Sequence, residues 1–83
     1  MSNTNEVRSL RAIARDIKGH WPNVYFSAAP YLQAMEQMES INEDFGWDPG
    51  KEIVLYFLAN AQTWKGEHAR RVKAELKAMA GIK

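Results

Sequence analysis

Apolar residues recur along most of this chain at three- and four-residue steps, the spacing that is typical of amphipathic helices. The first stripe predicts a helix over residues 4–19, which Asn3 and Glu6 would open as a capping box and Gly19 would end. This stripe consists of Val7, Leu10, Ile13, Ala14 and Ile17.

A second helix is predicted over residues 30–44, because Pro30 suits the first helical position and Gly46 suits a C-terminal stop. Its apolar side carries Leu32, Met35, Met38 and Ile41. Its other side carries carboxylates that we interpret as a solvated face, able to recognise a basic partner, rather than as a catalytic or cation-binding cluster. These are Glu36, Glu39, Glu43 and Asp44.

Two further helices are predicted in the second half of the chain. Asp48 and Pro49 indicate the start of a helix over residues 49–60, which is apolar almost all round and therefore suits a central, buried position. Thr63 can cap a last helix over residues 64–80.

These patterns predict a single all-α domain over residues 1–83, a compact bundle of about four helices. Residues 20–27 carry four large apolar side chains, so we expect this connector to fold back over the core. Whether it does so as a loop, a short helix or a strand stays open.

Composition limits the settings in which this domain would act. The sequence contains no cysteine, which excludes disulfides and thiolate metal sites. The longest apolar stretch, residues 53–59, is far shorter than the roughly 20 residues of a membrane-spanning helix. The N-terminal residues are polar and do not resemble a signal peptide. We therefore expect a cytoplasmic protein with no membrane partner.

Catalytic chemistry is not indicated by the residue types or their spacing. Ser9 and Ser40 have no neighbouring base and no glycine-rich elbow. His20 and His68 are not spaced three or four residues from another histidine, so both are interpreted as surface side chains. We therefore expect that the protein is not an enzyme, that it binds no cofactor, and that it has no catalytic or metal-binding residues.

Charge is strongly segregated although the net charge is only +1. Residues 1–26 carry four bases and two acids (+2), residues 27–50 carry no base and five acids (−5), and residues 51–83 carry seven bases and three acids (+4). Basic side chains form a stripe along the first and along the last predicted helix. Each stripe would serve as a binding surface or simply as the ordinary polar face of an amphipathic helix. The candidates for contact with a partner or a nucleic acid are Arg8, Arg11, Arg15, Lys18, Lys65, Arg70, Arg71, Lys73 and Lys77.

Residues 49–80 would also fit a helix-turn-helix-like region with a four-residue turn. Against this, the chain is much less basic than a typical nucleic-acid-binding module. Aromatic side chains offer a different indication, because several lie in or near the predicted connectors. Most would cover the core, and one or two left exposed would suit a protein interface. The candidates are Trp21, Tyr25, Tyr31, Trp47 and Trp64.

The segment over residues 53–76 contains the sequences YFL, NA and TWKGE, and PYL lies upstream of it. In these residues the chain resembles a group of short proteins encoded by tailed phages that infect actinobacteria. The resemblance covers about residues 10–78, implies no activity and carries over no functional residue. It implies a setting: a small protein that acts inside an infected bacterium, as many do by binding a host protein.

Three hypotheses follow from these observations. The first is a non-enzymatic, phage-encoded interaction module that binds a host or phage protein. The second is a small nucleic-acid-binding or transcriptional regulatory protein. The third is a structural homo-oligomer, in which the basic end helices of one copy pair with the acidic middle helix of another.

Overall fold

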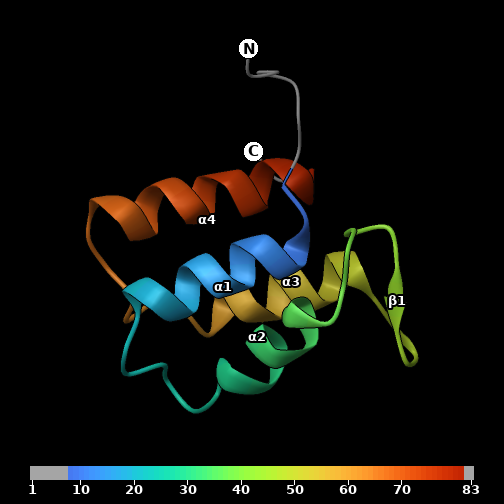
Figure 1. The fold of residues 1–83 in the computed structure, drawn as a ribbon, viewed down its shortest axis with the longest axis horizontal. Helices are drawn as coiled ribbons and strands as arrows, with labels where there is room; N and C mark the ends of the chain where they lie inside the picture. The colour runs from blue at the N-terminus through green and yellow to red at the C-terminus, as the bar shows by residue number, and fades with distance from the viewer. Residues whose placement is uncertain (1–7, 82–83) are drawn as a thin grey trace.

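The computed structural model describes residues 8–81, which form four helices and one short β-hairpin (Figure 1). The predicted number of helices is confirmed for this part of the chain, and the hairpin corrects the all-α prediction. The elements are α1 (Leu10–His20), α2 (Ala29–Glu36), β1 (Asp44–Phe45), β2 (Asp48–Pro49), α3 (Gly50–Ala59) and α4 (Glu67–Met79).

Helix α1 begins at Leu10, later than the predicted start at residue 4; Asn3 and Glu6 lie outside the described residues. Ser9 is the N-cap, and its hydroxyl oxygen accepts a hydrogen bond of 3.0 Å from the Ala12 backbone N–H. The first two backbone N–H groups of the helix, those of Leu10 and Arg11, donate to carbonyl oxygens beyond the end of α2. The helix therefore starts where both a local cap and a tertiary partner satisfy its first donors.

Helix α2 ends at Glu36, eight residues before the predicted end at residue 44. The Gln37 and Met38 N–H groups donate to the Ala34 and Met35 carbonyl oxygens, three residues back, and these tighter bonds close the last turn. Strands β1 and β2 follow and pair antiparallel across a two-residue turn of Gly46 and Trp47. Gly46 has φ +65°, which a type II′ hairpin turn requires at its first central position.

The hairpin closes onto the first residue of α3. The Gly50 N–H donates to the Glu43 carbonyl oxygen at 2.7 Å, and a Cβ atom on Gly50 would overlap the Ile41 carbonyl oxygen. Asp48 therefore lies in β2 rather than at a cap, and Pro49 is the residue before the helix rather than in its first turn. The predicted extent of α3 is otherwise confirmed to within a residue at each end.

Helix α4 begins at Glu67, three residues later than predicted, and Thr63 makes no capping hydrogen bond to it. Trp64 instead belongs to the connector, where it is buried against Trp21 and its indole N–H donates to the His20 carbonyl oxygen at 3.3 Å. Packing of this indole therefore sets the path of residues 60–66, which is longer than the three- to four-residue turn of a helix-turn-helix.

One apolar core connects all four helices. Figure 1 shows α1 between α4 and α2, with α3 behind it. The largest fully buried side chains are Phe57, Leu10, Ile13, Ile17, Met35, Met38, Leu76 and Val54. The connector after α1 covers this core only in part, because Trp21 is buried whereas Phe26 is 76% exposed. No helix in the described part of the chain is long and apolar enough to cross a membrane.

Candidate functional site

The most exposed large apolar side chain among residues 8–81 is Trp47, at 99% exposure. It is the second residue of the hairpin turn, and the register that pairs Phe45 with Asp48 places it at the tip. Phe45, in the adjoining strand, is 38% exposed. The hairpin therefore presents one fully accessible indole and a second aromatic ring beside it. We define the hairpin site as residues 43–49.

Carboxylates surround the hairpin site. Residues 39–52 contain five acids and one lysine, a net charge of −4. Glu39 is paired with Arg11 at 2.7 Å, but the other four have no ion-pair partner within residues 8–81. These four exposed carboxylates are Glu43, Asp44, Asp48 and Glu52. The exposed aromatic tip of the hairpin is therefore surrounded by negatively charged side chains.

The other predicted interface aromatics divide between core and surface. Trp21 and Trp64 are buried, and Tyr31 is half-buried with its ring 5.4 Å from that of Tyr56. Tyr25 is 44% exposed and contacts the more exposed Phe26. Three exposed aromatics escaped the sequence prediction: Phe26, Phe45 and Tyr56. Phe45 lies just beyond the predicted end of the second helix, and Tyr56 lies in the helix predicted to be apolar almost all round, where the pattern does not show which positions stay exposed.

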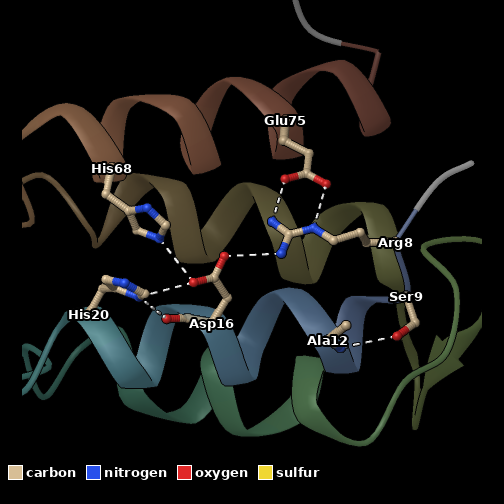
Figure 2. A network of polar contacts seen from close by, with 7 residues as sticks. All are labelled: Arg8, Ser9, Ala12, Asp16, His20, His68 and Glu75. Atoms are coloured by element: carbon tan, nitrogen blue, oxygen red, sulfur yellow. Dashed lines mark hydrogen bonds and ion pairs between the residues drawn. The ribbon is translucent and has the colours of Figure 1, made fainter. Parts of the chain in front are cut away.

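A second feature is a polar network between α1 and the start of α4 (Figure 2). Its centre is the Asp16 carboxylate, which is only 18% exposed. One oxygen, Oδ2, accepts from the Arg8 guanidinium at 3.0 Å. The other, Oδ1, lies 2.9 Å from His68 Nε2 and 3.0 Å from His20 Nδ1. A single carboxylate therefore joins three basic side chains.

Arg8 extends this network to α4 through a two-pronged ion pair with Glu75, at 2.6 and 3.0 Å. Partial burial opposes ionisation of Asp16, but hydrogen bonds from Arg8 and His68 outweigh it, so the pKa of Asp16 lies below its ordinary 3.8. The pKa of Arg8 is raised, chiefly by its hydrogen bonds to Glu75. Both groups are thus held in their charged forms.

The two histidines were interpreted from the sequence as surface residues without metal-ligand spacing. Both remain partly exposed, but their rings stack with centroids 3.8 Å apart. The sequence does contain one signal for this cluster. Asp16 and His20 are four residues apart and so share one face of α1. Nothing in the spacing of residues along the sequence predicts that His68, in α4, lies beside these two side chains.

The basic stripe on α1 is largely neutralised by acidic side chains. Arg8 pairs with Asp16 and Glu75, Arg11 with Glu39, and Lys18 with Glu36 at 3.0 Å, while Arg15 is exposed. Two of the carboxylates that the sequence placed on a solvated face of the second helix, Glu36 and Glu39, are therefore partners for α1. This stripe does not form a free cationic surface.

The second basic stripe divides between two places on and beside α4. His68 and Glu75 face α1, and Arg71 lies one turn from each on the same side and 4.0 Å from Glu67. A different group, of Lys65, Arg70 and Lys73, lines a shallow hollow beside Trp64. The Lys73 ammonium donates to the Trp64 carbonyl oxygen at 2.6 Å. Its pKa is lowered by burial and then by Lys77 and Lys65. Arg71 thus lines the same depression as Arg8, whereas Lys65, Arg70 and Lys73 gather at a separate hollow.

Comparisons of the chain with protein families, with curated proteins and with solved structures gave no match.

Proposed function

We propose that this chain is a non-enzymatic interaction module that docks onto a partner protein through the hairpin site. The observation that carries the proposal is the 99% exposure of Trp47 at the hairpin tip. An indole left in water contributes nothing to the core of its own fold. In an interface, by contrast, a tryptophan that enters a fitted pocket is the kind of residue that dominates binding energy.

The charge around the tip defines the partner surface. Asp44 and Asp48 flank the turn, and both are exposed. A complementary partner would offer an apolar pocket for Trp47 with lysine or arginine side chains at its rim. Such rim charges accelerate encounter and select the partner more than they tighten the complex, so binding should weaken moderately as salt rises.

The resemblance to short phage proteins supports a host protein as this partner, which would place the complex in the cytoplasm of an infected bacterium. The test begins with the full chain immobilised and exposed to actinobacterial lysate. Trp47→Ala is compared with Phe26→Ala, because both remove an exposed aromatic ring but only Trp47 lies in the hairpin site. Retained proteins are identified by mass spectrometry, purified and titrated.

We expect the Phe26→Ala variant to bind the purified partner like the original chain, and Trp47→Ala to bind at least about 30-fold more weakly, as for an interface hot spot. Emission from Trp47 should shift to shorter wavelength on binding. Equal affinities for both variants would contradict the proposal. A dimer of the original chain in light scattering that Trp47→Ala converts to a monomer would instead identify the occupant as a second copy.

A second candidate function, binding of nucleic acid, has support from α4 and the connector that precedes it. Burial lowers the pKa of Lys73 most and the nearby charges of Lys77 and Lys65 lower it further, while Arg70 lines the same hollow. Phosphates would relieve this repulsion, with a strong dependence on salt. Fluorescence anisotropy with labelled double-stranded DNA tests it. Micromolar binding that weakens steeply with salt and is lost in Arg70→Ala would support it; no binding at low salt would exclude it.

A further inference from the structure

We infer that Asp16, His20 and His68 form a binding site for a divalent transition-metal ion, with Zn²⁺ as the representative. Their potential ligand atoms all lie within 4.8 Å of one another. The site is separate from the hairpin, so this inference does not depend on the proposed docking function.

The donor set favours this class of cation. Two imidazoles and one carboxylate form the kind of three-ligand set that binds Zn²⁺ in sites that keep a fourth position open for water. Imidazole nitrogen suits Zn²⁺, Cu²⁺ and Ni²⁺, whereas Mg²⁺ and Ca²⁺ prefer oxygen ligands. We therefore expect selection of a transition metal over these two harder ions.

Two of the three separations between ligand atoms are near those of a metal centre. In a tetrahedral Zn²⁺ site the ligand atoms lie about 3.3 Å apart, as follows from metal–ligand distances of about 2.0–2.1 Å. Asp16 Oδ1 lies 2.9 Å from His68 Nε2 and 3.0 Å from His20 Nδ1. Rotation of the two partly exposed rings, which would separate their stacked planes, would admit an ion in place of the proton that links each ring to the carboxylate. The ring of His20 would also leave its contact with the Asp16 carbonyl oxygen.

Arg8 supplies the outer contact that such sites commonly have. It holds Asp16 Oδ2 and so directs Oδ1 towards the two rings, as Figure 2 shows. The positive charge of Arg8 opposes a cation, but its two-pronged pair with Glu75 offsets that charge. Arg71 lines the same depression and is a second opposing charge, although it is 75% exposed and therefore well screened.

A bound ion would connect two elements that are distant in the chain. Asp16 and His20 lie in the last turns of α1, and His68 lies in the first turn of α4, 52 residues after Asp16. Because the unfolded chain does not hold these donors together, the ion would bind the folded state in preference and stabilise it. Zn²⁺ at about 100 times its dissociation constant should raise the melting temperature by at least about 5 °C.

The test is isothermal titration of the full chain with ZnCl₂ near pH 7.5. We expect one Zn²⁺ per chain with a micromolar dissociation constant, and no heat of binding from MgCl₂. The variants His68→Gln, His20→Gln and Asp16→Asn each remove one ligand while keeping a polar side chain, and each should weaken Zn²⁺ binding more than tenfold. Glu67→Gln is the matched control, because it removes an exposed carboxylate next to His68 and should bind as the original chain does.

A spectroscopic readout separates metal binding from any loss of fold. The ring of Trp64 lies 6.2 Å from that of His68, so Cu²⁺ in the site should quench its fluorescence. The Trp47→Phe background removes the exposed indole. In that background, quenching by Cu²⁺ should disappear with His68→Gln, whose fold is checked by circular dichroism in EDTA. Absence of Zn²⁺ binding by the original chain, or unchanged affinity in the folded ligand variants, would overturn the inference.

Discussion

The indole rings of Trp21 and Trp64 stack with centroids 5.6 Å apart and an interplanar angle of 13°. This contact joins the connector that follows α1 to the connector that precedes α4. Both indoles are buried, and the ring of Trp21 also packs at 73° to that of Phe57 in the last turn of α3. The pair therefore fixes two loops against α3.

We predict a measurable coupling between these two indoles. Trp21→Leu and Trp64→Leu each keep apolar bulk but remove the stacked ring. Urea unfolding of both single variants and the double variant should give a coupling free energy of about 0.5–1.5 kcal/mol. Additive effects would show that the stacking itself does not stabilise the fold. Alanine at either position should cost about 3–5 kcal/mol, which would leave so small a domain barely folded.

Substitution of Gly50 should be strongly destabilising. A Cβ atom there would overlap the Ile41 carbonyl oxygen and lie 2.9 Å from that of Glu43, and both are backbone atoms that cannot rotate away. We expect Gly50→Ala to cost at least about 1–3 kcal/mol in urea unfolding, as overpacking does. Gly19→Ala is the control: nothing lies within 4 Å of its Cβ position and it is within α1. It should stabilise by about 0.5–1 kcal/mol, and a loss of stability there would contradict this account.

Ser9→Ala removes the side-chain cap of α1. The expected cost is about 1 kcal/mol, because the Ala12 N–H loses its acceptor. Ser9→Asp should retain most of the stability, since a carboxylate can accept the same hydrogen bond and suits a helix N-terminus. Thermal unfolding of the three proteins at neutral pH measures both effects. Equal stability of Ser9→Ala and the original chain would mean that the tertiary contacts alone define this helix start.

Acid should destabilise the fold through Asp16. Its pKa in the folded chain lies below 3.8, so the unfolded state binds more protons as the pH falls through this range, and stability falls with it. The contribution is present above 3.8 and is lost as the pH falls through the folded value. Asp16→Asn should therefore show a shallower loss of stability in acid, measured by urea unfolding between pH 5 and pH 2.

Asp44→Asn is the control for this experiment, because it removes an exposed hairpin carboxylate that has no ion-pair partner within residues 8–81. It should follow the acid profile of the original chain. An identical profile for Asp16→Asn would show that the contacts from Arg8 and His68 do not stabilise the charged carboxylate.

The local sequence pattern was sufficient to predict the helices but not the residues at which they begin and end. The apolar stripe of Leu10, Ile13 and Ile17 predicted the buried side of α1, yet the helix starts where Ser9 and the chain beyond α2 satisfy its first donors. The hairpin was missed because its strands have only two residues each, too few to show alternation. Of the candidate interface aromatics, Trp47 is fully exposed, whereas Trp21 and Trp64 proved to be core.

The amino-acid sequence by itself determined that this chain forms helices with one apolar side, that it lacks cysteine chemistry, and that its charge is segregated along its length. Only the tertiary structure decided what those charges do. Lys18 and Glu36 neutralise each other, while Asp16 gathers Arg8 and two histidines from opposite halves of the chain. The physical reason is range: helix periodicity acts over a few residues, whereas ion pairs and stacked rings form between segments that meet only when the core closes.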